Sequence, residues 1–227
     1  RLICLVGILL FSFQNSSAQF ILKNGSTSEK ISIHTQSEFV DVGENNLSLE
    51  QVRTSKALQF KPMLNENTDF GFTTHHFWIR FQLKNSTEKK RYYFFETARP
   101  ITDFAELYVV YPNKSVSKLI SGDAIPRSQR SFDHRKTIFK IEIQPGEQQQ
   151  FYLHVKSDGE MLSMPMILYS LEALVQMTSF EQFVFGFFYG ILIIAAILYL
   201  FFFFAMRDRT FFYYSLYVVF IGLLQFA

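Results

Sequence analysis

The sequence predicts an all-β exported domain, a jelly-roll-like β-sandwich, followed by transmembrane α-helices. Two observations carry this prediction. Between residues 31 and 170, apolar side chains recur mostly at every second position, as in strands with one buried face. Residues 183–205 then run without a charged, amide or proline side chain, and as a helix they span roughly 35 Å, more than the ~30 Å hydrocarbon core of a bilayer.

The predicted sandwich is built from short strands separated by turn-forming residues. The clearest strands are residues 77–83, 92–97, 104–111, 139–143 and 151–155. At least seven strands with little helix between them favour two packed sheets, with a closed barrel as the alternative. Ser48 and Gln51 fit the spacing of a capping box, so we also expect one short helix that begins beside Ser48.

The C-terminal region divides into four predicted parts: a juxtamembrane helix at 171–182, a transmembrane helix at 183–206, a turn at 207–210 and the start of a second transmembrane helix at 211–227. A buried helix of a soluble protein is the alternative for the first span. Arg207 and Arg209 set the topology, because an arginine near the bilayer centre costs about 2.5–3.5 kcal/mol. The positive-inside rule places their turn in the cytoplasm and the residues before 183 outside it.

The N-terminus predicts export of the domain at residues 19–170. Residues 1–18 combine a basic residue, an apolar run and small residues before Ala18, which is the pattern of a cleaved signal peptide. An uncleaved signal anchor is the alternative and leaves the topology unchanged. The only cysteine, Cys4, lies in this segment, so the mature domain must fold by burial of its core without disulfides. These features favour a bacterial periplasmic domain.

Charge and motifs argue against several functions. A net charge of +2 and the absence of a basic stripe with interleaved aromatics predict no nucleic-acid partner. The sequence has no phosphate-binding glycine loop and no Gly-x-Ser-x-Gly motif, and the predicted mature domain has no cysteine nucleophile. We therefore expect no enzyme in this part of the chain. Adjacent His75 and His76 point to opposite faces of a strand, so we expect neither a metal site nor a cofactor.

Five residues are candidates for ligand binding. If Phe77 and Ile79 face the core, Trp78 and Arg80 share the opposite face, where an indole can stack on a sugar ring and a guanidinium can bind carboxylate or hydroxyl groups. The alternative is that this face is covered, with Trp78 in the core and Arg80 paired to an acid such as Glu106.

The other three candidates, Arg130, His134 and Arg135, lie in a polar stretch of about fifteen residues that is long enough for a binding loop. Their charges suit an anionic ligand. The alternative for this stretch is a solvated loop with no ligand.

Several segments in a fixed order resemble one receptor family. They are HFWIRFQLKN (76–85), DFAELYVVYPN (103–113), SGDAIPRSQRSFDHR (121–135), QPGEQQQFYLHVKSDG (144–159) and the apolar segment from residue 185 to residue 217. Together they resemble the bacterial seven-transmembrane receptors with diverse intracellular signalling modules. The resemblance implies an exported jelly-roll domain similar to carbohydrate-binding modules, seven membrane helices and a cytoplasmic effector such as a histidine kinase or a diguanylate cyclase.

The expected function is that of a sensor in the bacterial inner membrane. The sandwich recognises a ligand, which the resemblance suggests is a carbohydrate, or a partner protein, and the membrane helices carry the change to an effector outside this sequence. The partners are then the lipid bilayer, this ligand and the effector. Gly186 and Gly190 present a small face for helix packing within the bundle or in a homodimer. The rivals are a membrane-anchored carbohydrate-binding or envelope-interaction module without signalling, and a transporter or enzyme with an exported accessory domain.

Overall fold

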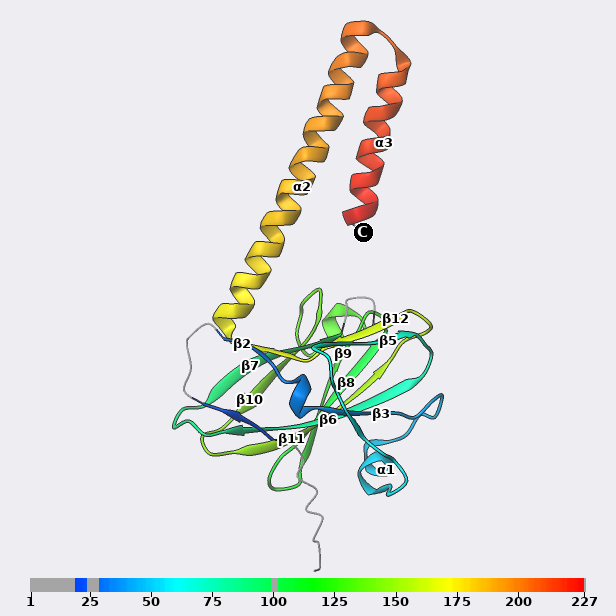
Figure 1. Cartoon of the computed structure of the whole chain (residues 1–227). Coiled ribbons are helices and arrows are strands. Elements are labelled where there is room, and N and C mark those ends of the chain that lie inside the picture. The colour runs from blue at the N-terminus through cyan, green and yellow to red at the C-terminus, as the bar shows by residue number, and fades with distance from the viewer. Residues whose placement is uncertain (1–18, 24–28, 99–101, 227) are drawn as a thin grey trace, which may run out of the picture. The chain divides into compact units, whose positions relative to one another are not determined.

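The computed structural model describes residues 19–23, 29–98 and 102–226, so the predicted signal peptide lies outside the described residues. The chain divides after Leu171 into a β-rich unit and a helical unit (Figure 1). The first unit contains β1 (Gln19–Leu22), β2 (Lys30–Ser32), β3 (Glu38–Asp41), α1 (Leu49–Thr54), β4 (Lys61–Pro62), β5 (Asn67–Phe72), β6 (His76–Asn85), β7 (Arg91–Ala98), β8 (Phe104–Val110), β9 (Val116–Ser121), β10 (Thr137–Ile143), β11 (Gln148–Lys156), β12 (Met161–Pro165) and β13 (Ile167–Tyr169). Short 3-10 helices lie at His34–Gln36 and Arg127–Gln129.

The strands form separate sheets instead of a closed barrel. The larger sheet has the order β4-β3-β6-β11-β8-β9, and β1 pairs in parallel with the second half of β6. The smaller sheet has the order β10-β7-β13-β2, and β12 and β5 form a two-stranded ribbon. All the pairings except that of β1 are antiparallel. The prediction of an all-β domain built from packed sheets is confirmed.

The main core lies between the two larger sheets. The alternating residues of β6 contribute Phe77, Ile79, Phe81 and Leu83, all buried in one cluster. The ring of Phe81 stacks on that of Phe151 at 4.9 Å and meets that of Phe95, from the smaller sheet, at 5.0 Å. Aromatic pairs at these distances add to the burial of apolar area that holds a sandwich together.

The opposite face of β6 is also covered, by the short helix α1 and its flanking residues. The predicted capping box is present: the Gln51 amide donates to Ser48 Oγ at 3.3 Å and the Ser48 amide donates to Gln51 Oε1 at 2.8 Å. The helix that it begins, α1, contributes Val52 to a second buried cluster. The members of that cluster are Val40, Val42, Val52, Trp78, Val110 and Tyr152.

The helical unit is an antiparallel pair of α2 (Leu171–Met206) and α3 (Arg209–Phe226) (Figure 1). The juxtamembrane segment and the first span lie in one unbroken helix, α2. Of the helices in the described residues, α2 meets the length and composition expected of a membrane span. Ser215 Oγ donates to the Ala196 carbonyl at 2.9 Å, and the rings of Tyr199 and Tyr214 lie 5.6 Å apart, so polar and aromatic contacts join the pair.

The turn between these helices is shorter than the predicted 207–210. Arg207 adopts a left-handed conformation with φ 55° and ends α2. Asp208 Oδ1 then accepts a hydrogen bond from the Thr210 amide at 2.9 Å, the contact that an N-capping residue makes. Because Asp208 caps the next helix, α3 begins at Arg209, two residues before the predicted start at Phe211.

The segment after β9 is held close to Asp103. The Asp123 amide donates to the Thr102 carbonyl at 2.8 Å and the Ala124 amide to the Asp103 carbonyl at 3.2 Å. Between them, Gly122 has φ +127°, and a Cβ there would lie 2.2 Å from the Asp103 carbonyl oxygen. Only glycine fits this approach.

We expect Gly122→Ala to destabilise the sandwich more than Gly146→Ala. Both glycines have positive φ, which disfavours alanine by about 1–2 kcal/mol, but a Cβ at Gly146 meets nothing within 4 Å. At Gly122 the clash with a backbone oxygen adds to that strain. Urea unfolding followed by the fluorescence of the only tryptophan, Trp78, measures both variants; equal losses would contradict the steric argument.

Candidate functional site

Trp78 is not an exposed stacking platform. Its side chain is fully buried, and its ring stacks on those of His154 at 4.7 Å and Tyr108 at 5.6 Å. The covered-face alternative therefore describes Trp78, and the expectation that its indole is open to a sugar is wrong for this conformation. The physical reason is α1 with its flanking segments, whose apolar residues pack over this face of the sheet.

Arg80 is likewise occupied. Its Nε donates to Glu38 Oε2 on the neighbouring strand at 2.7 Å, and its guanidinium lies 4.2 Å from the centre of the Phe60 ring. The partner is Glu38 instead of the expected Glu106, because Glu38 is directly opposite Arg80 in the register of β3 and β6. The pair and the ring contact hold the segment around Phe60 over the sheet.

A polar chain crosses the outer face of the larger sheet beside Trp78. Nδ1 of His76 lies 2.9 Å from Nε2 of His154, and Nδ1 of His154 lies 3.2 Å from Glu106 Oε2. Glu106 also accepts from the Tyr108 hydroxyl at 2.8 Å and pairs with Lys118 Nζ at 2.7 Å. Both histidines are buried. These polar contacts link four neighbouring strands: β6, β11, β8 and β9.

Glu106 is the electrostatic centre of this polar chain. Hydrogen bonds from His154, Lys118 and Tyr108 lower the pKa of its carboxyl group to about 2, in spite of the burial that opposes ionisation. The same carboxylate raises the pKa of Lys118, and burial followed by the bond to Glu106 raises that of Tyr108. The carboxylate is therefore ionised throughout the physiological range.

Two of the three loop candidates, Arg130 and His134, make hydrogen bonds within their own loop. The Arg130 side chain is 11% exposed, and its Nε donates to the Ile125 carbonyl at 2.9 Å. Nδ1 of His134 accepts from the Lys136 amide at 3.0 Å, and its ring stacks on that of Phe132. These contacts favour a structural part for Arg130 and His134, and they do not bring Arg80 and the loop together. A ligand-binding role for Arg135 stays a prediction.

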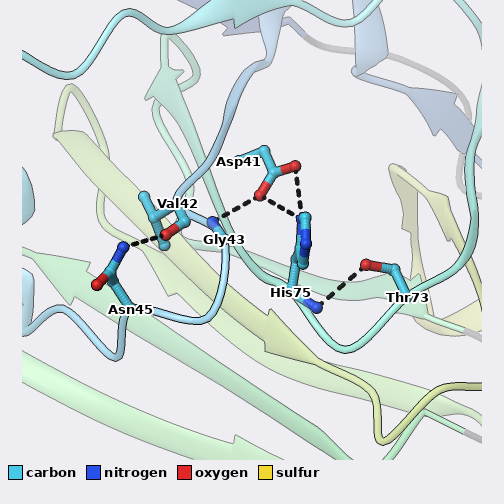
Figure 2. A network of polar contacts seen from close by, with 6 residues as sticks. All are labelled: Asp41, Val42, Gly43, Asn45, Thr73 and His75. Atoms are coloured by element: carbon cyan, nitrogen blue, oxygen red, sulfur yellow. Dashed lines mark hydrogen bonds and ion pairs between the residues drawn. The ribbon is translucent and has the colours of Figure 1, made fainter.

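A surface hollow of about 620 Å³ lies where β3, β5 and β6 meet, and the sequence did not single it out. Its polar side chains include Asp41, Lys61, Thr73 and His75. Nδ1 of His75 is 3.1 and 2.9 Å from the two carboxylate oxygens of Asp41, and both side chains are close to half exposed. Figure 2 shows this pair: Asp41 also accepts the Gly43 amide at 2.8 Å, and Thr73 Oγ1 accepts the His75 amide at 3.1 Å.

Aromatic rings form the apolar part of the hollow. Phe70 packs on Phe39 at 5.0 Å and on Phe77 at 4.3 Å, whereas Phe72 is 81% exposed. An irregularity in β5 separates their environments: Asp69 pairs with Ser163 and Phe72 with Met161, so β5 advances by three positions where β12 advances by two. Gly71, with φ +71°, lies within it. Such bulges redirect side chains and are common beside binding sites.

The hollow can offer hydrogen bonds and an aromatic surface to a small molecule. Its volume lies within the ~300–1,000 Å³ that is usual for ligand sites. Asp41 accepts and Lys61 donates, while Phe72 presents a ring face or edge. Within the described residues, no group of three or more His, Cys, Asp or Glu side chains could hold a metal ion.

Comparison with known proteins places the two units in one receptor class. Residues 35–170 match the family model described as 7TMR-DISM extracellular 2, and residues 181–227 match the model described as 7TM diverse intracellular signalling. An extracellular sensor domain followed by a transmembrane region defines a membrane receptor. The chain belongs to the family of seven-transmembrane receptors with diverse intracellular signalling modules, and the expected resemblance is confirmed.

Other comparisons add little. No curated protein matches the chain. Among solved structures, a Bacillus thuringiensis Cry1Da tryptic core variant matches with 9% identity and a TM-score of 0.29. The match covers 46% of this chain and 20% of that one, and a TM-score this low does not indicate a shared fold.

We expect Glu106→Gln to lower the free energy of unfolding by about 1.5–3 kcal/mol, because charged hydrogen bonds to a partly buried carboxylate are lost. The folded-state pKa of Glu106 is lowered from 4.5 to about 2, so its stabilisation is complete above pH 4.5 and disappears as the pH falls toward 2. The variant should lack this part of the acid dependence.

Glu142→Gln is the matched control for this prediction. Glu142 pairs with Lys90 at the surface and is 43% exposed, so its loss should cost at most about 1 kcal/mol. Urea unfolding at pH 7 and pH 3 compares the two variants, and similar losses for both would contradict the central part assigned to Glu106.

Proposed function

We propose that the chain is the N-terminal sensor part of a multi-pass receptor of the bacterial inner membrane. The periplasmic sandwich binds a small ligand, and the helical bundle carries the change to a cytoplasmic effector. The order of the two family matches, an extracellular domain directly before the transmembrane region, is the observation that supports this proposal. Both matched domain types are those of sensors and membrane regions, not of enzymes.

The hollow between β3, β5 and β6 is the proposed ligand site. A carboxylate, an ammonium group and hydroxyls beside an exposed ring form the set of contacts that a polyhydroxylated ring requires, because hydroxyls donate to carboxylates while the C–H face of the ring packs on an aromatic. A mono- or disaccharide therefore suits the site better than a purely apolar ligand. This assignment moves the proposed sugar contact from Trp78 to Phe72.

Ligand binding at the hollow should raise the unfolding midpoint of the sandwich by mass action. The 227-residue chain in lipid nanodiscs is screened with sugars, peptidoglycan fragments and small anions, and Trp78 fluorescence reports unfolding of the sandwich alone. For a sugar that shifts the midpoint, Phe72→Ala and Asp41→Asn should each weaken binding about tenfold or more, which corresponds to about 1.4 kcal/mol of lost contacts.

Leu64→Ala is the matched control, since Leu64 is 80% exposed and apolar but does not line the hollow. It should leave the ligand response unchanged. If a ligand shifts the midpoint and the Phe72 and Asp41 variants respond as the control does, the hollow is not the site. If only an anion acts, the proposed polyhydroxylated ligand is wrong.

The proposed topology is tested separately by cysteine labelling in bacterial cells. In a Cys4→Ser background, Thr73→Cys should react with a membrane-impermeant maleimide in intact cells, because Thr73 borders the hollow. Asp208→Cys should react only after the inner membrane is opened, because Arg207 and Arg209 place its turn in the cytoplasm. Labelling of Asp208→Cys in intact cells would reverse the assigned orientation.

A further inference from the structure

Two buried histidines on neighbouring strands share a single hydrogen. His76 on β6 and His154 on β11 are each 8% exposed, and Nδ1 of His76 lies 2.9 Å from Nε2 of His154. The Glu106 carboxylate, 3.2 Å from Nδ1 of His154, can only accept, so it keeps a hydrogen on that nitrogen. In the neutral pair, Nε2 of His154 therefore accepts the Nδ1 hydrogen of His76.

The pair tolerates one added proton but not two. A single proton leaves one hydrogen between the facing nitrogens, whichever ring carries the charge. A second proton places two N–H donors against each other at a distance that requires one donor and one acceptor, and it brings two positive charges together in a buried site. The second protonation therefore breaks the hydrogen bond between the two imidazoles, His76 on β6 and His154 on β11.

The surroundings of the pair oppose a charge on His76. Glu106 and Tyr108 on β8, with Lys118 of β9 paired to Glu106, lie on the His154 side. Burial, then His154 and then Lys156 lower the pKa of His76, against the opposite effect of Glu106. Asp41 of β3 is committed to the neighbouring His75.

The backbone of His76 continues into the wall of the hollow. Its amide donates to the Gly43 carbonyl at 2.7 Å, and its carbonyl accepts the Val42 amide at 3.0 Å. The Gly43 amide in turn donates to the Asp41 carboxylate that holds His75 (Figure 2). A shift of His76 thus displaces the segment that orients the Asp41 and His75 side chains.

We propose that the His76–His154 pair is a proton-sensing element, in which double protonation in acid breaks the hydrogen bond between the two imidazoles and loosens the Val42–Gly43 segment. The effect on ligand binding rests on the proposed function of the hollow, whereas the response of the pair to protons does not. Because the folded state disfavours charge on His76, the sandwich loses stability as the pH falls below about 6.5 and through the lowered pKa.

Trp78 provides the test, since it is the only tryptophan and its ring stacks on that of His154. An imidazolium beside an indole quenches its fluorescence. In the 227-residue chain in nanodiscs, we expect a reversible fall in emission between pH 7.5 and pH 5, with circular dichroism unchanged. His76→Asn and His154→Gln keep one polar atom near the shared position and should each remove this transition or shift its midpoint.

His75→Asn is the matched control, since His75 adjoins His76 but bonds Asp41 on the other side of the strand. It should retain the wild-type transition. The proposal is overturned if emission is flat in the folded wild type, if both pair variants titrate as the wild type does, or if His75→Asn alone abolishes the change. Amide exchange at Val42 and Gly43, corrected for intrinsic rates, should rise in acid in the wild type but not in His154→Gln.

If neither His76→Asn nor His154→Gln folds, an NMR titration of the imidazole Cε1–H signals of the wild-type chain tests the proposal. Coupled titration of His76 and His154, distinct from that of His34, His75 and His134, supports the element, and independent titration of both near pH 6.5 overturns it. None of these measurements requires a ligand. A failure of the sugar screen therefore leaves this result intact, and the reverse also holds.

Discussion

Burial of β6, along its whole inner face and at His76 and Trp78 on its outer face, is the constraint on which the rest of the sandwich depends. This ten-residue strand pairs with β11 along its whole length, and on its other edge β3 and β1 share it end to end. Phe81 and its alternating neighbours fill the core between the sheets, while Trp78 fills the cluster under α1. A strand buried on both sides cannot slip by one residue, since each slip would exchange the two sets of side chains. The position of β6 therefore also sets the register of the strands that pair with it.

Double burial also explains the polar chain beside Trp78. Strand pairing places the buried His154 opposite the buried Trp78, and the partly buried Glu106 opposite His154. Buried polar groups are tolerated only when they bond to one another. The chain from His76 to Lys118 satisfies this requirement with one carboxylate and one ammonium group. The proposed ligand site lies instead at the margin of the sheet, where Asp41 and His75 keep access to solvent.

Sequence patterns predicted what local chemistry determines. Period-two alternation identified the core face of β6, the spacing of Ser48 and Gln51 identified the helix start, and the apolar run identified α2. The alternation of apolar and polar residues could not reveal whether another segment of the chain covers the opposite face, because a buried tryptophan and an exposed one occupy the same register. The hollow was missed for a related reason: Asp41, Lys61 and the stretch from Phe72 to His75 are three segments that only the sheet topology brings together. The irregularity around Gly71 was the one local signal.

The connection between the last strand of the sandwich and α2 is short. β13 ends at Tyr169 and α2 begins at Leu171, so a single residue, Ser170, connects strand and helix. Ser170 is not slack, because its amide donates to the Glu29 carbonyl at 2.9 Å and its Oγ accepts the Glu29 amide at 3.0 Å. A flexible linker would absorb small displacements of the sandwich. This connection differs from such a linker, because it is one residue long and is held through its backbone amide and its hydroxyl oxygen.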